Sequence, residues 1–326
     1  MLSTNLLAAC VAAALTSIAL IPLSKAVSKK TGCMGIDVHK TPSYPVPKLG
    51  GLIVVGGVMA GYGVASPYLD NTTLAFYFST ALAAFIGLYE DFREVNPILK
   101  PMLLALAGVP VLFFGTYSPN PVIPFVGNAR LTIVYPLLVL IGYAVVCNAV
   151  NSIDVLNGSL AYTTLAALIP LSLASLLEAK TETLALCLVL AVSLTVFLSV
   201  NKYPSKVFAG NVGSLFIGAA LTFITITGRL EVLAIVALIP QIMNEFHIIF
   251  SMRGLKSAKN SVKRPVLVEN GKIRASREKE APITLLRMVS ATTPLTEKQA
   301  VNHIAILSLY SALLSTITYL LLIRGV

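Results

Sequence analysis

The stretch TLALCLVLAVSLTVFLSV, residues 183–200, contains no charged residue and is mostly apolar. As a helix it is long enough to cross the hydrocarbon core of a bilayer, which takes roughly 20 residues. Ten such stretches occur in the chain, at residues 5–24, 49–66, 72–89, 98–116, 131–147, 159–177, 183–200, 212–227, 231–252 and 303–323. The sequence therefore predicts an all-α polytopic membrane protein with about ten transmembrane helices.

Composition agrees with this prediction and excludes an ordinary soluble domain. Hydrophobic residues make up 56% of the chain and charged residues only 12%, and the mean hydropathy is +0.84. We expect the ten helices to form one membrane-embedded domain over residues 1–326. No aromatic residues interleave with the basic ones and no nucleic-acid motif is found, so nucleic acid is not an expected partner.

The positive charges are distributed unevenly between the connections. Of the 24 Lys and Arg residues, 20 lie in alternate connections, and eleven of these lie between Arg253 and Lys298. The other connections and the C-terminal tail hold only Arg130, Lys180, Arg229 and Arg324. The positive-inside rule then predicts five cytoplasmic connections and both termini outside. Because those five connections also carry most acidic and amide residues, we expect the chemistry at the cytoplasmic face.

Residues 253–300, between the ninth and tenth stretches, are long enough to have structure of their own. Within them, PVLVENGKIRA (residues 265–275) alternates apolar and polar residues on both sides of Asn270-Gly271. This pattern predicts a β-hairpin with a type I′ turn. We therefore expect a small cytoplasmic α/β insertion that binds substrate.

Two cytoplasmic segments combine charge with glycine or proline. GIDVHKTPSYPVPKLGG (residues 35–51) carries Lys40 and Lys48, which could meet phosphate, although basic loops also serve membrane topology alone. GLYEDFREVNPILK (residues 87–100) places Glu90 and Asp91 at the end of a helix, followed by Lys100. Carboxylates at a membrane boundary are costly unless they pair, bind a cation or reach water. A solvated helix end is the alternative explanation.

A third segment, NAVNSIDVLNGSLA (residues 148–161), is rich in amides. Asn148 and Asn151 share one face of a helix because they are three residues apart, and Asp154, Asn157 and Gly158 follow in the turn. Amide and carboxylate oxygens there suit Mg²⁺ or a polar ligand. The alternative is a capped joint between two helices.

The fourth segment is NKYPSKVFAGNVGSLFIG, residues 201–218. Its AGNVGS portion opens a helix, and backbone N–H groups beside glycines at a helix N-terminus form an anion site. A plain glycine-containing loop is the alternative.

In order and spacing the four segments resemble the polyprenyl-phosphate N-acetylhexosamine-1-phosphate transferases, a family of ten-span membrane enzymes. The resemblance runs from about Gly35 to the last span and rests chiefly on NAVNSIDVLNG and YPSKVFAGNVGS. GIDVHK, NKYPSKVF and PQIMNEF are most similar to the eukaryotic and archaeal dolichyl-phosphate GlcNAc-1-phosphate transferases. Residues 253–300 contain no histidine, whereas the bacterial phospho-MurNAc-pentapeptide translocase has a histidine-rich motif there.

The resemblance implies transfer of GlcNAc-1-phosphate from UDP-GlcNAc to a polyprenyl or dolichyl phosphate, with release of UMP. The cofactor it implies is Mg²⁺, with Mn²⁺ as an alternative, held by Asn151 and Asn211. It also implies that Asn157 reads the uracil and that Lys100 contacts the diphosphate. The catalytic residues are then Glu90, Asp91, Lys100 and Asp154. The substrate-binding residues are Lys40, Asn148, Asn157, Gly158, Phe208, Lys263 and Arg264.

Two residues depart from the family pattern. Glu90 replaces the first aspartate of an acidic pair, and Asn211 replaces an aspartate that binds Mg²⁺ in the family. Asn211 keeps a carbonyl oxygen but loses the negative charge that a hard cation favours. Asn211 therefore keeps a non-catalytic lipid-phosphate-binding homologue as one alternative. A secondary transporter is kept as another, because ten spans with polar residues in the membrane fit that class too.

The expected surroundings follow from the same resemblance. Membrane lipids are expected partners, and a homodimer is left open. The expected location is the plasma membrane of a bacterium or archaeon, or the endoplasmic reticulum membrane of a eukaryote.

Overall fold

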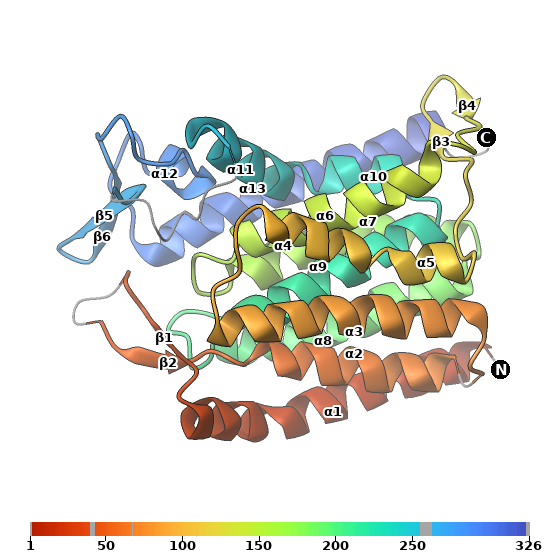
Figure 1. Ribbon diagram of the computed structural model, residues 1–326, viewed down its shortest axis with the longest axis horizontal. Coiled ribbons are helices and arrows are strands. Elements are labelled where there is room, and N and C mark those ends of the chain that lie inside the picture. The colour runs from red at the N-terminus through yellow and green to blue at the C-terminus, as the bar shows by residue number, and fades with distance from the viewer. Residues whose placement is uncertain (1, 40–42, 67, 255–262, 324–326) are drawn as a thin grey trace.

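The computed structural model describes residues 2–39, 43–66, 68–254 and 263–323. These residues form a helical bundle with three small hairpins (Figure 1). The first half of the chain contains α1 (Leu2–Thr31), β1 (Met34–Ile36), β2 (Pro45–Pro47), α2 (Gly51–Ala65), α3 (Asn71–Phe92), α4 (Leu99–Leu106), α5 (Val109–Phe113), β3 (Val122–Ile123), β4 (Gly127–Asn128) and α6 (Tyr135–Ser152). The second half contains α7 (Ser159–Leu177), α8 (Thr181–Asn201), α9 (Gly210–Thr227), α10 (Glu231–Ala237), α11 (Ile239–Ser251), β5 (Val266–Glu269), β6 (Lys272–Ala275), α12 (Leu285–Val289), α13 (Glu297–Thr318) and the π-helix η2 (Tyr319–Ile323).

The protein is an integral membrane protein, and its helices confirm the all-α polytopic class. Seven described helices are long and apolar enough to span a bilayer, and the bent pair α10 and α11, which meet at 69°, makes an eighth candidate. All ten predicted stretches are helical, but the predicted number of ten spans is not shown. The helix α2 has only 15 residues, and a break at Ala107–Gly108 divides the stretch 99–113 into α4 and α5. Pro110 in the first turn of α5 removes a backbone donor there.

The centre of the bundle is α9, which packs against α2, α3, α6 and α8. Small residues permit these contacts. A Cβ atom on Gly51 would lie 2.2 Å from the Cα of Gly213, and one on Gly218 would lie 2.5 Å from the Cα of Cys147. Because lipid provides no hydrophobic force between helices, close packing through such residues is a main source of association in membranes.

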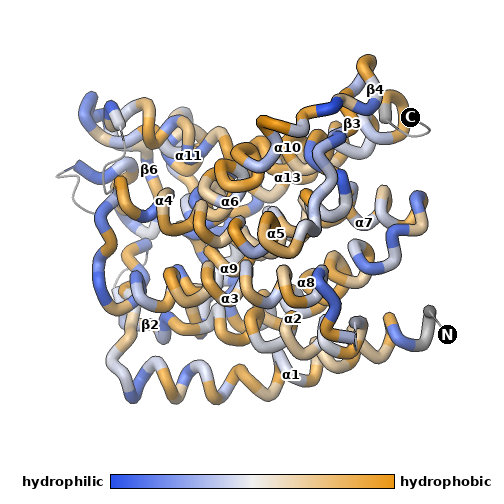
Figure 2. The backbone as a smooth tube through the Cα atoms, turned by 45° about the vertical axis from the view of Figure 1, so that its right-hand side comes forward, coloured by the Kyte–Doolittle hydropathy of each residue, from blue (hydrophilic) through white to orange (hydrophobic). Residues whose placement is uncertain are grey.

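The two ends of the bundle differ. The start of α1 and the end of α13 lie at one end of the bundle, and the β1–β2 and β5–β6 hairpins with α12 lie at the other (Figure 1). Hydrophilic residues gather at both ends, while the helices between them are mainly hydrophobic (Figure 2). We call the end with these hairpins the hairpin end.

The predicted hairpin in residues 265–275 is confirmed. Strands β5 and β6 are antiparallel with Glu269 opposite Lys272. Asn270 and Gly271 form the turn with φ of 51° and 71°, and positive φ at both positions is what a type I′ turn requires. The last long helix begins earlier than the predicted stretch 303–323, because Thr296 and Gln299 form a capping box ahead of α13.

Candidate active site

A cavity of about 1400 Å³ opens at the hairpin end of the bundle, among residues of α3, α4, α6, α9, α11 and β5. It brings together segments that are far apart in the sequence. The predicted site residues that line it are Glu90, Lys100, Asn148, Asn151, Asp154, Asn157, Phe208, Asn211 and Arg264. Three others, Asp91, Gly158 and Lys263, are not among its lining residues. Lys40 lies outside the described residues.

Asp91 lies behind the cavity wall and holds the N-terminus of α9. Its side chain is fully buried and forms an ion pair of 2.8 Å with Lys48. Its two oxygens accept the backbone N–H groups of Asn211 at 2.9 Å and Val212 at 3.0 Å. A carboxylate at this position is favoured by the unpaired N–H groups and by the helix dipole. Asp91 therefore positions the first turn of α9 in this structure.

Gly210 makes that approach possible. Its φ is +68°, and a Cβ atom on it would lie 2.7 Å from Asp91 Oδ2 and 2.5 Å from the Lys48 carbonyl oxygen. Only glycine combines this backbone conformation with so little space. Gly210 in the AGNVGS segment thus allows the backbone at the start of α9 to lie close to the Asp91 carboxylate.

Glu90, the neighbour of Asp91, faces the cavity. Its carboxylate contacts the Lys100 ammonium at 2.8 Å, which joins the end of α3 to the start of α4. Both side chains are mostly buried. The ion pair holds the Lys100 ammonium at the edge of the cavity, where the ammonium can contact an anionic substrate.

The end of α6 and the amide-rich turn that joins it to α7 bring amide and carboxylate groups to the cavity. Asn151 accepts a hydrogen bond of 2.7 Å from the Ser214 hydroxyl of α9, and Asn148 donates one of 2.8 Å to the Ala144 carbonyl oxygen. Burial, and then the negative charge of Asp91, raise the pKa of the Asp154 carboxyl to about 7, although Lys48 opposes this. A carboxylate so disfavoured by its surroundings would gain from a cation beside it.

The same turn is tied to distant segments. Asn157 donates its side-chain N–H to Asp37 at 3.1 Å and its backbone N–H to Glu297, at the start of α13, at 2.9 Å. Gly158 has φ +93° and donates to Asn201 at 3.1 Å. Gly158 thus connects the start of α7 to the end of α8.

The comparisons with known proteins address this region directly. The family model described as glycosyl transferase family 4 matches residues 73–229, from α3 through α9. A protein of Saccharolobus solfataricus, provisionally named a UDP-N-acetylglucosamine–dolichyl-phosphate N-acetylglucosaminephosphotransferase, is 30% identical over 224 residues, or 66% of this chain and 69% of the relative. The chain belongs to glycosyl transferase family 4.

Two further relatives support this membership. A Sulfolobus acidocaldarius protein with the same provisional name is 30% identical over 61% of this chain and 64% of its own length. An undecaprenyl-phosphate N-acetylglucosaminyl 1-phosphate transferase of Bacillus subtilis, also provisionally named, is 27% identical over 66% of this chain. The chain spans 64% of the first of these relatives and 60% of the second. The family of polyprenyl-phosphate N-acetylhexosamine-1-phosphate transferases predicted from the motifs is thereby confirmed.

The cavity residues fit the divalent cation associated with family 4. Asn151, Asp154 and Asn211 present oxygen donors from two elements, and hard cations such as Mg²⁺ prefer oxygen ligands. The half-buried Asp154, with its raised pKa, supplies the charge that the amides lack. A second group, Asp37, His39 and Glu297, has ligand atoms within 4.8 Å of one another and could also hold a metal ion.

The remaining predicted residues are divided between the cavity and the outer surface. Phe208 lines the cavity, and its backbone donates to Pro47 and accepts from Gly50. Arg264 lines it from the insertion. Lys263 instead contacts Glu278 at 2.8 Å and Glu280 at 3.2 Å on the surface of the insertion. Adjacent residues of an extended segment point to opposite sides, so only one of this pair reaches the cavity.

Sequence reasoning missed five acidic residues near this site. Two of them, Glu94 and Glu269, line the cavity. Asp37 and Glu245 also line the cavity, and Glu297 binds the amide-rich turn from the opposite end of the chain. Asp37 lies inside the GIDVHK motif, so the resemblance could have indicated it. The sequence around Glu297 indicates only the start of a helix. Its contact with Asn157 could not be predicted, because Asn157 is 140 residues away in the chain.

Proposed function

We propose that the protein transfers GlcNAc-1-phosphate from UDP-GlcNAc to a polyprenyl phosphate of the dolichyl type and releases UMP. The observation that carries this proposal is the cavity of about 1400 Å³ at the hairpin end. It combines amide and carboxylate oxygens with the ion-paired Lys100 and with Arg264. The provisional names of the two archaeal relatives support GlcNAc as the sugar and dolichyl phosphate as the acceptor.

In the proposed reaction a phosphate oxygen of the acceptor attacks the sugar-bearing phosphorus of UDP-GlcNAc. The bond from that phosphorus to the bridging oxygen breaks, and UMP leaves with this oxygen. The acceptor is already ionised at neutral pH, so no residue need remove a proton from it. A bound Mg²⁺ or Mn²⁺ would supply positive charge that offsets the repulsion between the phosphates.

Several of the predicted site residues have a defined part in this proposal. Lys100, held by Glu90, binds the diphosphate. Asp91 keeps the first turn of α9, and with it Asn211, in position. Arg264 covers the sugar-phosphate end, and Asn157 reads the base. All of these assignments serve positioning and charge stabilisation, which dominate catalysis of phosphoryl transfer.

The proposal includes an orientation. Twenty of the 24 basic residues lie in the connections assigned to the cytoplasm, which supports a cytoplasmic cavity, termini outside and ten crossings. A location in a prokaryotic plasma membrane agrees with the prokaryotic relatives. The homodimer stays a prediction.

The decisive experiment measures UMP release by the purified full-length chain with UDP-GlcNAc and dolichyl phosphate, with and without Mg²⁺. We expect metal-dependent release. Lys100→Ala should reduce turnover on the order of 100-fold. Lys180→Ala is the matched control, since Lys180 also pairs with a glutamate, Glu178, but outside the cavity. Solute flux into vesicles without UMP release would favour a transporter, and equal loss in both variants would refute the placement of Lys100.

A further inference from the structure

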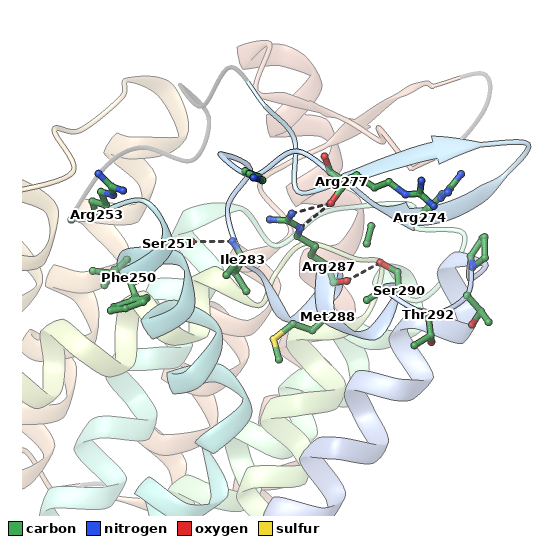
Figure 3. A pocket seen from close by; sticks show the side chains of 18 residues that line it. Phe250, Ser251, Arg253, Arg274, Arg277, Ile283, Arg287, Met288, Ser290 and Thr292 are labelled. Atoms are coloured by element: carbon green, nitrogen blue, oxygen red, sulfur yellow. Dashed lines mark hydrogen bonds between the residues drawn. The ribbon is translucent and has the colours of Figure 1, made fainter.

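A second cavity, of about 1250 Å³, lies beside the first at the hairpin end. It is formed by the end of α11, by β6 and the segment after it, and by α12 with the loop that follows (Figure 3). The two cavities share only Ile249 and Gly254. We call the second cavity the basic pocket. Its charged lining residues are Arg253, Arg274, Arg277, Lys279 and Arg287.

None of the described residues that line the basic pocket is acidic, although acidic residues lie close to it in the sequence. In the segment SREKEA, residues 276–281, Arg277 and Lys279 line the pocket. Glu278 and Glu280 instead form ion pairs with Lys263. Alternation along the chain therefore places the two positive charges inside the pocket and the two negative charges outside it.

Arg287 has a structural role in the pocket, because it holds the segment after β6 in place. The Arg287 guanidinium donates hydrogen bonds to the backbone carbonyls of Ser276, Glu278, Ala281 and Pro282. These bonds hold the segment that carries Arg277 and Lys279. Among the described residues, Arg253, Arg277 and Lys279 take part in no ion pair. Their charges are thus available to a ligand.

The apolar residues of the pocket lie on its bundle side. Phe250 and Met288 point toward the helices, whereas Arg274 and Arg277 lie on the side away from them (Figure 3). The exposed fractions are 73% for Phe250, 48% for Met288 and 39% for Ile283. Phe246, one turn before Phe250 on α11, is also exposed and stacks with it. An apolar strip thus runs along a membrane helix and ends at a cluster of positive charges.

We infer that the basic pocket binds an anionic phospholipid of the surrounding membrane. The phosphate of the headgroup contacts Arg253, Arg277 and Lys279, and the acyl chains lie along Phe250 and Phe246. A neutral lipid would gain the apolar contact alone, whereas an anionic one also gains the electrostatic attraction of several unpaired cations. The bound lipid fixes the insertion against the membrane surface, and the insertion carries Arg264 over the neighbouring cavity.

The experiment titrates the full-length protein in a neutral maltoside detergent with phosphatidylglycerol or phosphatidylcholine of equal chain length. Native mass spectrometry counts the bound lipid. We expect the chain to retain phosphatidylglycerol in preference to phosphatidylcholine. Each removed cation should weaken this binding by roughly fivefold, so Arg277→Gln/Lys279→Gln should weaken it by roughly 25-fold.

Two further variants make the test specific. Lys30→Gln/Lys272→Gln removes two exposed charges at the same end that do not line the pocket, and it should bind as the unmodified chain does. Phe250→Ser should weaken retention of phosphatidylglycerol while leaving Arg253, Arg277 and Lys279 in place. Because these positions are exposed, the unfolding midpoints of the variants in neutral detergent should stay unchanged.

Several results would overturn the inference. Equal retention of the two lipids would mean that the headgroup charge is not recognised. Equal loss in the two double variants would mean that total charge, not the pocket, binds the lipid. Displacement of phosphatidylglycerol by inorganic phosphate at equal concentration would identify a free-anion site. Dependence of polyprenyl phosphate binding, and not phosphatidylglycerol binding, on Arg277 and Lys279 would identify an acceptor site.

Discussion

Asn211 lies in the first turn of α9, lines the cavity and donates its backbone N–H to Asp91. If its side chain binds the metal, the cation is held by a neutral amide where the family uses a carboxylate. Asn211→Asp should then lower the Mg²⁺ concentration for half-maximal UMP release, because added negative charge offsets dehydration of the ion. Asn211→Ala should raise that concentration. Titration of all three forms with Mg²⁺ decides the matter, and identical curves would remove Asn211 from the metal site.

Asp154 should make the binding of Mg²⁺ in the cavity depend on pH. Its pKa of about 7 means that the carboxyl is mostly protonated below pH 7 and mostly ionised above it. Since Mg²⁺ binds the ionised form, protons compete with the metal below this pH. The Mg²⁺ requirement should therefore rise roughly tenfold for each pH unit below the pKa. Half-saturating Mg²⁺ concentrations between pH 5 and 8 test this, and Asp154→Asn, as the control, should abolish the pH dependence.

At the scale of single elements, α9 is held by glycine contacts that leave no room for side chains. Gly51→Ala would place a Cβ atom 2.2 Å from Gly213 Cα and force α2 and α9 apart. Overpacking of this kind costs roughly 1–3 kcal/mol, so the unfolding midpoint in detergent should fall. Gly142→Ala, whose Cβ would have its nearest neighbour at 3.7 Å, is the matched control and should be neutral or stabilising. A similar midpoint for both variants would refute this packing.

At the same scale, buried amides of neighbouring helices hold the amide-rich turn in place. Asn201, at the end of α8, accepts from Gly158 and donates to Val207, so it links the segments 148–161 and 201–218. Asn244 of α11 donates to Ser152 and accepts from Leu285 of α12. The insertion and the bundle are thereby connected through one buried amide. Polar side chains at these helix ends serve the assembly of the site as well as its chemistry.

At the scale of the whole molecule, the hairpin end should face the cytoplasm. A cysteine at the exposed Lys272 position should react with a membrane-impermeant thiol reagent only from the cytoplasmic side. Arg130→Cys, also exposed, serves as the matched control for the end with the termini and should react only from outside. Both should be made in a Cys10→Ser background, since the other three native cysteines are buried. Labelling of the Lys272 position from outside in intact cells would refute the orientation.

Local sequence patterns were sufficient to predict the helical class, the β5–β6 hairpin and nine of the residues that line the cavity. Apolar length predicts a membrane helix, and an Asn-Gly turn between alternating residues predicts a hairpin, because both depend on neighbours within about 20 residues. The length of the apolar stretches does not determine the number of spans. It does not show that α2 is short, or that Gly108 and Pro110 divide α4 from α5. Two predicted residues make structural contacts instead. Lys263 forms an ion pair with Glu278 on the surface of the insertion, and Gly158 donates a hydrogen bond to Asn201.

Only the tertiary structure decided how the helices face one another. A helix that is apolar on all sides carries no periodicity that identifies its buried face, so its partners cannot be inferred from the chain alone. For this reason the burial of Asp91 against α9, the contact of Glu297 with the amide-rich turn and the separation of charges around the basic pocket became visible only in three dimensions. The sequence by itself determined which groups are present at the hairpin end. Close packing through glycines determined which of them meet.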